Sequence, residues 1–196
     1  MRAREIEYWD AVAGKIAEKG IRDNWIKRQF LAQFLFKCTW TGEKVLEIGV
    51  GCGVSAAMLA TSCGMNWEYI GTELSPHFAK MAKEHFGLHV VQGDVLSLPE
   101  GKFTRIIALD SLEHVRQEER EQGYRNIADR MEPGALLFLN VPFERSLHED
   151  EFDHGFGMID FVKLCDSGMI LKKYENYGIK YGNYARNYAF AVMERR

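Results

Sequence analysis

The sequence predicts an α/β fold, a doubly wound sheet of seven strands that is mostly parallel, with helices on both faces. Two observations lead to this prediction. Strand-like and helix-like segments alternate five times along the chain, the order expected of an open parallel sheet. The tail then reads as a helix and two strands, residues 169–181 and 183–196, and a connection of so few residues forces an antiparallel pair.

Two helices are expected ahead of the sheet. Residues 4–19 place apolar side chains at a helical period and stop at Gly20. A second helix begins at Asp23 or Asn24, either of which is a favourable N-cap, and runs to residue 36. The N-terminal part of the chain is therefore predicted to be helical.

The elements of the sheet are expected to follow in a regular order. The helix after Ser75 has the clearest start, because serine is a favourable N-cap and Pro76 suits the first helical position. Another helix ends at Gly64, and a third closes before Pro133 and Gly134. The expected strands span 44–50, 67–74, 88–94, 103–112 and 135–142, and the expected helices span 54–63, 75–87, 120–131 and 156–168.

Length and composition fit one soluble globular domain. The chain has 196 residues, of which 46% are hydrophobic and 27% charged. No run approaches the roughly 18 apolar residues of a membrane span, and the N-terminus lacks an apolar signal core. The four cysteines form no CxxC pair, which favours reduced thiols in a cytoplasm. The net charge of −3 comes without a dense basic cluster, so neither nucleic acid nor membrane is expected as a partner, and a monomer or homodimer is expected.

Three alternating glycines, Gly49, Gly51 and Gly53, stand between the first strand and its helix. In open α/β sheets, ligands bind beyond the carboxyl ends of the strands, where the strand order reverses. Glycines let the backbone approach a ligand closely, and the helix start presents N–H groups to a negative group. Glu73 ends the second strand 20 residues past Gly53, a spacing typical of an acid that binds ribose hydroxyls. The bend and Glu73 together predict a ligand that contains a nucleoside.

Two ligand classes fit such a bend. A dinucleotide fingerprint, GxGxxG, requires its third glycine at position 54, where this chain has Val54. The pattern present is GxGxG, preceded by Glu47. The segment VLEIGVGCG (45–53) resembles motif I of the class I S-adenosylmethionine-dependent methyltransferases. Their later motifs are similar to GTELS (71–75), GDVLSLP (93–99), IIALDSLEHV (106–115) and MEPGALLFLNVP (131–142).

The resemblance covers about residues 40–145 and continues into the antiparallel tail. LEHV (112–115) is similar to the matching segment of the small-molecule branch, the quinone-biosynthesis or type 11-like methyltransferases. This resemblance implies a Rossmann-like fold, with S-adenosylmethionine as cofactor and S-adenosylhomocysteine as product. It also implies a single methyltransferase domain over residues 1–196. The expected parts of that domain are a helical lid (1–38), a cofactor-binding core (39–145), and an acceptor-facing loop, helix and strand pair (146–196).

The resemblance also implies which residues bind the methionine and ribose parts of the cofactor. The loop formed by Gly49, Gly51 and Gly53 would run under the methionine portion. Glu47 would bind the amino group, directly or through water, and Glu73 would bind the ribose.

The adenine end has its own set of implied residues. Asp94 would accept a hydrogen bond from the adenine amino group, and the Val95 N–H would lie near a ring nitrogen. Leu74 and Leu96 would sandwich the ring. Asp110, at the end of the fourth strand, would contact the methionine end. A plain turn aspartate is the alternative interpretation of both aspartates.

Fewer signals bear on the remaining residues of the site. Arg28 lies where relatives often pair a cation with the cofactor carboxylate, although a solvated helix face is an equal alternative. Tyr8 and Trp9 are the lid residues expected to face the acceptor. His114 and His154 are the candidate catalytic bases; helix capping or packing is the alternative for each. A base is required only if the acceptor carries a proton at working pH.

The acceptor is expected to be a small organic molecule methylated at oxygen or nitrogen. DSLEH (110–114) stands where amino-directed nucleic-acid and glutamine methyltransferases carry [DN]PP[YF], and no cysteine follows a proline as in the cytosine-5 type. The acidic segment 148–154 is interpreted as a solvated loop, so no metal is predicted. Two alternatives stay open: a catalytically silent protein that binds S-adenosylmethionine or S-adenosylhomocysteine, and a nicotinamide-dependent oxidoreductase.

Overall fold

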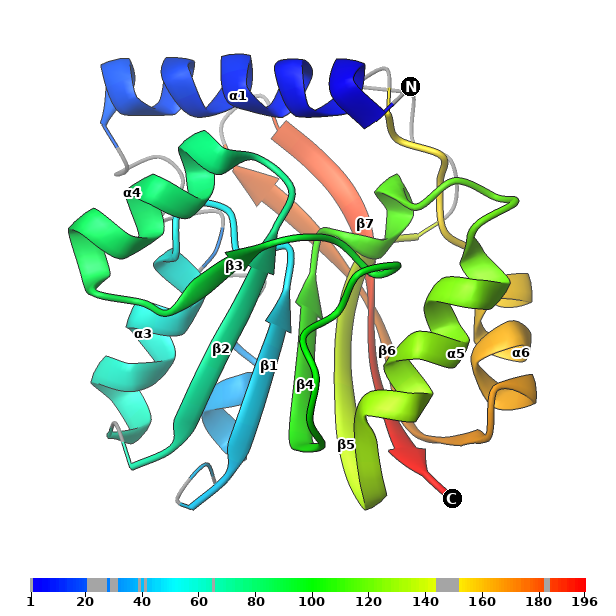
Figure 1. Ribbon diagram of the computed structural model, residues 1–196. Helices are drawn as coiled ribbons and strands as arrows, with labels where there is room; N and C mark the ends of the chain where they lie inside the picture. The colour runs from blue at the N-terminus through cyan, green and yellow to red at the C-terminus, as the bar shows by residue number, and fades with distance from the viewer. Residues whose placement is uncertain are drawn as a thin grey trace. The chain divides into compact units, whose positions relative to one another are not determined.

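The structure is a computed structural model that describes residues 2–20, 28, 32–38, 40, 42–64, 66–143, 152–181 and 184–196 (Figure 1). Its contacts divide the chain into two compact units, residues 1–99 and 100–196, which are described in turn. The predicted helix over 23–36 lies mostly outside the described residues. Within that range, the structure describes Arg28 and residues 32–36. A short 3-10 helix, η1 (Leu35–Lys37), lies at the end of the range.

The first unit contains three parallel strands. Each ends one or two residues earlier than the sequence predicts. Hydrogen bonds between the strands continue just past these ends, where the Gly49 N–H donates to the Thr72 carbonyl at 2.9 Å and the Gly93 N–H to the Glu73 carbonyl at 3.0 Å. The strands lie in the order β3-β2-β1 and comprise β1 (Lys44–Ile48), β2 (Glu68–Glu73) and β3 (Val90–Gln92).

The helices of the first unit begin and end close to the expected residues. Helix α3 spans Val54–Cys63 as predicted, and α4 spans Pro76–Phe86. The Ser75 hydroxyl caps α4 by accepting the Phe78 N–H at 3.0 Å. Gly87 closes α4 in the left-handed conformation. These local signals therefore determine the helix boundaries.

Helix α1 (Arg2–Lys19) packs on α3 and α4. Figure 1 shows it (dark blue) across the edge at which β1 and β2 end. The Asp10 carboxylate fixes it there, because it accepts hydrogen bonds from the Ser75 hydroxyl and from the His77 N–H at the start of α4. The apolar contact includes Trp9, Val12, Ala13 and Ile16 of α1 with Cys52, Val54, Met58, Phe78 and Met81.

The second unit contains four strands in the order β4-β5-β7-β6. β4 and β5 are parallel, whereas β7 is antiparallel to both of its neighbours, β5 and β6, as the tail predicts. The elements are β4 (Phe103–Leu109), η2 (Leu112–His114), α5 (Arg120–Arg130), β5 (Met131–Pro142), α6 (Met158–Asp166), β6 (Met169–Tyr181) and β7 (Tyr184–Arg195).

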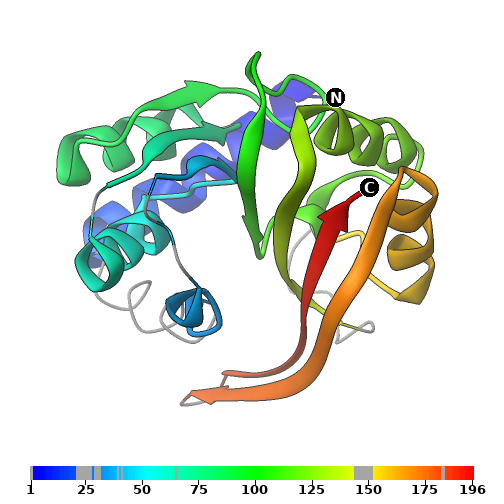
Figure 2. The same cartoon turned by 90° about the horizontal axis from the view of Figure 1, so that it is seen from below.

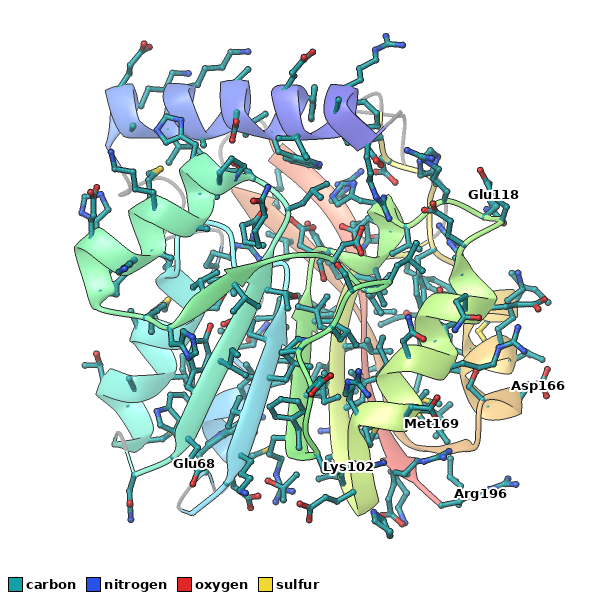
Figure 3. All side chains as sticks on the ribbon, in the orientation of Figure 1. Glu68, Lys102, Glu118, Asp166, Met169 and Arg196 are labelled. Carbon is teal, nitrogen blue, oxygen red and sulfur yellow. The ribbon has the colours of Figure 1, made fainter. Side chains whose placement is uncertain are left out.

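The strand pair β6 and β7 runs side by side along its length, as Figure 2 shows (orange and red). Its register begins with Met169 opposite Arg195 and ends with Tyr181 opposite Tyr184. Figure 3 labels Met169 and Arg196 at the end of this pair opposite to Tyr181 and Tyr184, where the Arg196 N–H donates to the Gly168 carbonyl at 3.1 Å. The long register fixes which side chains of the two strands become neighbours.

The largest differences from the predicted boundaries in the second unit lie at β5 and β4, where the predictions are wrong. β5 begins at Met131, not at residue 135, because Met131 pairs with Phe103 while Leu136 pairs with Arg105. The extra residues of β5 form a bulge, in which Gly134 has a φ of +76°. β4 ends at Leu109, and the residues that follow turn into η2.

A buried ion pair connects α5 to α6. Arg120 Nη1 donates to both carboxylate oxygens of Asp160, at 2.9 and 3.0 Å, and both side chains are almost fully buried. The Tyr124 hydroxyl donates to the same carboxylate at 3.0 Å, and the Gly157 N–H donates at 2.9 Å. Arg120 also donates to the Gly155 carbonyl, so the pair holds the segment that leads into α6.

Candidate functional site

The glycine loop follows β1 and opens directly onto α3. Gly51 has a φ of +57° and Gly53 a φ of +87°, a region that side chains rarely adopt. A Cβ at Gly53 would lie only 2.8 Å from Leu88 Cδ1, so glycine is required there by space as well. A Cβ at Gly51 would meet Arg28 Nη2 at 3.5 Å, an ordinary contact. The loop is therefore packed on one side at Gly53 and less crowded at Gly51.

Glu73 is a buried carboxylate held by backbone donors at the end of β2. Its Oε2 accepts the Gly51 N–H at 2.7 Å, and its Oε1 accepts the Ser75 N–H at 2.9 Å. Burial raises the pKa of Glu73, whereas these N–H groups and the charge of Arg28 act in the opposite direction. The carboxylate is thus fixed against the glycine loop.

Glu47 is a buried carboxylate near the end of β1, and its hydrogen-bond donor is the side chain of Tyr69. Its side chain is 1% exposed, and its Oε2 accepts a hydrogen bond from the Tyr69 hydroxyl at 2.8 Å. Burial raises the pKa of Glu47 to about 7, while Tyr69 and Arg28 lower it and Glu73 raises it. Glu47 therefore changes charge near neutral pH. The sequence singled out Glu47 but gave no role to Tyr69.

Asp94 stands in the turn after β3. Its Oδ1 accepts the Leu96 N–H at 2.8 Å and the Ser97 hydroxyl at 3.3 Å. Its Oδ2 forms an ion pair with Arg2, at the first turn of α1. Val95 is buried in the same turn. The structure therefore brings the predicted adenine residues of this turn next to the N-terminal helix.

The other predicted residues of the first unit take different positions. Arg28 is half-buried beside Gly51, and its charge acts on Glu47 and Glu73. Tyr8 and Trp9 contact each other edge to face, with ring centroids 4.9 Å apart, and Trp9 packs on the core under α1. Leu74, half-buried after β2, accepts a hydrogen bond at its carbonyl from the Gln92 side chain.

Asp110 marks a polar cluster at the carboxyl ends of β4 and β5. With a φ of +56°, it is the one non-glycine residue with positive φ in the described part of the chain. Its N–H donates to the Asn140 carbonyl at 2.7 Å, and its Oδ1 accepts the Tyr188 hydroxyl at 2.9 Å. Asn140 in turn donates to the Tyr177 hydroxyl, and the two tyrosine rings stack with centroids 6.0 Å apart.

Sequence analysis missed the two tyrosines of this cluster. They belong to β6 and β7, and they become neighbours because Tyr177 pairs with Tyr188. The register that brings them together depends on the whole strand pair. The available signal was the even spacing of four residues between Tyr177 and Tyr181 and between Tyr184 and Tyr188 in the sequence, which favours rings on one face of each strand.

His114 and His154 lie in two segments that are tied to each other. His114 Nδ1 lies 3.2 Å from the Phe152 carbonyl oxygen, and the His154 N–H donates to the Glu113 carbonyl at 3.0 Å. His114 Nε2 is 3.6 Å from a carboxylate oxygen of the buried Glu113. Nε2 of His154 is buried and has no hydrogen-bond partner among the described residues.

The acidic segment after β5 is described only from residue 152 onward. There, Asp153 forms a buried ion pair with Arg186 and accepts the Gly155 N–H at 2.9 Å, so it is a structural group. The acids at 149–151 lie outside the described residues. Within the described ranges, no three His, Cys, Asp or Glu side chains are arranged to hold a metal ion. None of the described helices has the length and apolar character needed to cross a membrane.

Comparison with known families identifies the region around the glycine loop. A family profile described as a methyltransferase domain matches residues 45–134, which include Glu47, Glu73, Asp94 and Asp110. A curated relative, the protein-L-isoaspartate O-methyltransferase of Bradyrhizobium sp., is 31% identical over 107 residues. The match covers 50% of this chain and 45% of that protein, so the chain spans less than half the length of this relative.

Similar solved structures cover nearly the whole chain. A chain of the complex between the Haloferax volcanii Trm112 methyltransferase activator and the putative methyltransferase superimposes with a TM-score of 0.77 at 16% identity, covering 95% of this chain and 96% of that one. The TehB-like S-adenosylmethionine-dependent methyltransferase of Corynebacterium glutamicum gives 0.72 at 18% identity, covering 95% and 99%. The [4+2]-cyclase SpnF gives 0.70 at 16% identity, covering 85% and 80%.

At these identities the structural likeness bears on the fold, and it confirms the predicted fold class: a Rossmann-like α/β fold with an antiparallel C-terminal strand pair. The family profile matches the segment that carries the glycine loop and the carboxylates after it to a methyltransferase domain. Over residues 45–134 the chain is therefore similar to methyltransferases, and its fold is like that of the S-adenosylmethionine-dependent methyltransferases.

Proposed function

We propose that the protein transfers a methyl group from S-adenosylmethionine to an oxygen or nitrogen atom of a small organic acceptor, by in-line displacement. The observation that carries the proposal is the pair of buried carboxylates, Glu47 and Glu73, at the ends of adjacent parallel strands beside the glycine loop. A ligand with an ammonium group and ribose hydroxyls would find an acceptor for each. The residues present therefore fit the cofactor of the family.

The amino-acid end of the cofactor would lie against the glycine loop. Glu47 accepts the amino group, and the Arg28 guanidinium pairs with the carboxylate. This assignment is supported by the position of Arg28, whose Nη2 would lie 3.5 Å from a Cβ placed at Gly51. Asp110 is proposed to act near the same methionine end from its own strand terminus.

The adenosine end would extend from Glu73 toward the turn after β3. The two backbone donors that hold Glu73 orient its oxygens, whose remaining lone pairs can accept ribose hydroxyls. Asp94 is proposed to accept from the adenine amino group, with the Val95 N–H at a ring nitrogen. Leu74 and Leu96 are proposed to cover the two faces of the ring.

The chain's task in the reaction is mainly to position the acceptor and exclude water. When bound, the cofactor would supply a methyl group on a positively charged sulfur. A lone pair of the acceptor would form the new bond to the methyl carbon as the carbon–sulfur bond breaks, leaving S-adenosylhomocysteine. Holding the two groups in line contributes roughly 7–11 kcal/mol. An acceptor with a hydroxyl or ammonium group must also lose a proton, for which His114 and His154 are the proposed bases. Tyr8 and Trp9 of α1 are proposed to face the acceptor.

Replacing each histidine separates catalysis from cofactor binding. We expect His114→Ala and His154→Ala to lower turnover, about 100-fold for a true general base, with S-adenosylhomocysteine affinity unchanged. His85→Ala, an exposed histidine at the end of α4, is the matched control and should be neutral. Turnover that stays at the wild-type value across the pH range in both variants would exclude both histidines as bases.

The acceptor class has competing support. The curated relative is named for O-methylation of isoaspartate in proteins, and the Haloferax relative is a complex with a methyltransferase activator. We favour a small acceptor because DSLEH replaces the proline motif of amino-directed enzymes. The structure of SpnF, which shares the fold, is described as a [4+2]-cyclase and not as a methyltransferase, so a protein on this fold that binds the cofactor without methyl transfer is the second candidate.

The remaining proposals concern organisation and location. Residues 1–196 are proposed to act as one domain with α1 as part of a lid, supported by the position of α1 across the edge of β1 and β2. A cytoplasmic monomer or homodimer, with neither nucleic acid nor membrane as partner, is proposed from the free cysteines and the absence of a basic cluster in the sequence.

An acceptor screen with methyl-labelled cofactor tests the proposed reaction. Label should appear on a small hydroxylated or amino compound. Label on a protein or peptide carboxyl group would move the acceptor to the class of the curated relative. Binding of S-adenosylhomocysteine with no transfer to any acceptor would favour the silent alternative, and a response to NAD alone would favour the oxidoreductase.

A further inference from the structure

A pair of side chains on β1 and β2 meets beneath the glycine loop. Glu47 pairs with Gly71 across the two strands, and Tyr69 stands two residues before Gly71, so its side chain lies on the same face as that of Glu47. The Tyr69 hydroxyl reaches along this face to Glu47 and donates a hydrogen bond at 2.8 Å. Tyr69 thus contacts Glu47 without itself belonging to the loop.

Gly71 provides the space for this contact. A Cβ at Gly71 would lie 2.3 Å from Val50 Cγ2, too close for a real Cβ, and 3.0 Å from the Tyr69 hydroxyl oxygen, a tight contact. A side chain at position 71 would therefore displace the Val50 side chain and crowd the tyrosine hydroxyl. The glycine, the tyrosine and the glutamate form one unit of structure.

Burial makes the hydrogen bond decisive for the charge on Glu47. With 1% of the side chain exposed, water contributes little to stabilising the carboxylate. The groups that act on it are the Tyr69 hydroxyl and the Arg28 guanidinium, which favour the ionised form, and the Glu73 carboxylate, which opposes it. Burial and the neighbouring carboxylate hold the pKa of Tyr69 well above its ordinary value, so its hydroxyl remains a donor through the neutral range.

An ionised Glu47 attracts the ammonium group of a bound amino acid moiety, whereas a protonated Glu47 loses that charge interaction. Removing the Tyr69 hydroxyl removes a donor that favours the ionised form, so Glu47 would protonate at higher pH. We infer that Tyr69 is a positioning residue that keeps Glu47 ionised, and that the pair makes cofactor affinity fall as the pH drops below neutrality. The inference rests on the proposed function, in which Glu47 binds the cofactor amino group.

The test compares Tyr69→Phe with wild type by calorimetry from about pH 5.5 to 9, the range across which Glu47 titrates. S-adenosylhomocysteine carries the amino group, and methylthioadenosine has the same adenosyl part without amino or carboxylate groups. For S-adenosylhomocysteine, the variant should bind about fivefold more weakly at pH 7 and equally at pH 9, because its affinity midpoint shifts up by about one pH unit. Methylthioadenosine should show no such shift.

Two further variants keep the test sharp. Tyr174→Phe removes a tyrosine hydroxyl that bonds Asn176 on the exposed side of β6, and should match wild type at every pH. Glu47→Gln cannot ionise, so its affinity for S-adenosylhomocysteine should be weak and flat over the range in which the wild type changes. A Tyr69→Phe loss that is the same at all pH values, or a pH profile that overlays the wild type, overturns the inference.

A measurement without cofactor distinguishes this inference from the proposed function. The carboxyl carbon of Glu47, followed by NMR in ¹³C-labelled protein, should titrate at higher pH in Tyr69→Phe than in wild type. If this midpoint moves but S-adenosylhomocysteine does not bind wild type at any pH, the proposed function fails while the Tyr69–Glu47 pair stands. If S-adenosylhomocysteine binds but the midpoint does not move, the role of Tyr69 fails and the proposed function stands.

Discussion

The buried carboxylates of β1 and β2 accept hydrogen bonds from different kinds of donor. Glu73 accepts two backbone N–H groups, which are fixed by the fold, whereas Glu47 accepts the hydroxyl of a side chain. Side-chain substitutions other than proline leave backbone donors in place, so the donors of Glu73 depend on the fold, whereas that of Glu47 depends on the side chain of Tyr69. Glu73 is therefore suited to accepting hydrogen bonds from neutral hydroxyls, and Glu47 to binding a positively charged group.

Substitution of Glu73 tests its proposed role in binding the ribose. We expect Glu73→Ala to weaken S-adenosylhomocysteine binding by about 1–3 kcal/mol, because the hydrogen bonds that the ribose hydroxyls donate to a charged carboxylate are lost. Calorimetry checks this, with Glu84→Ala on the exposed face of α4 as control. Affinity equal to wild type would remove Glu73 from the site.

At the scale of elements, the segment that carries His154 is held by the helices on either side of it. Arg120 of α5 bonds the Glu113 and Gly155 carbonyls and the Asp160 carboxylate, so one guanidinium connects the end of η2, the segment before α6 and α6 itself. The position of the candidate base thus depends on a buried ion pair that bonds the residue next to it.

Breaking this ion pair should destabilise the protein strongly. We expect Asp160→Asn to reduce the free energy of unfolding by about 3–5 kcal/mol, because Arg120 would stay buried without its counter-charge. Denaturant unfolding measures the change. The matched control is Glu121→Gln, whose exposed pair with Arg125 should contribute less than about 1 kcal/mol. A loss for Asp160→Asn as small as that of the control would contradict the structural role.

For the whole molecule, the sequence predicted what local chemistry decides. The Ser75 cap, Gly64 and the apolar period located α3 and α4, and the short connection after residue 181 predicted the antiparallel pair. The bulge of β5 and the contact of Tyr188 with Asp110 were not predictable, because each depends on register between distant strands. The Tyr69–Glu47 contact likewise depends on Gly71 facing Glu47 across the sheet.

The predicted site residues divide between the two units. The first unit carries Arg28 and the cofactor residues from Glu47 to Leu96, together with Tyr8 and Trp9, and the second carries Asp110, also proposed for the cofactor, and both histidines. Motif order in the sequence was sufficient to nominate both groups. The identity of the acceptor had no comparable signal, because positioning catalysis requires no fixed set of side chains.

A crystal structure of the protein grown with saturating S-adenosylhomocysteine tests most directly whether the cofactor binds at the glycine loop. We expect the ribose hydroxyls within hydrogen-bonding distance of the Glu73 carboxylate, the amino group at Glu47 and the thioether beside Gly51. A ligand bound away from this loop, or no ligand at saturation, would contradict this expectation.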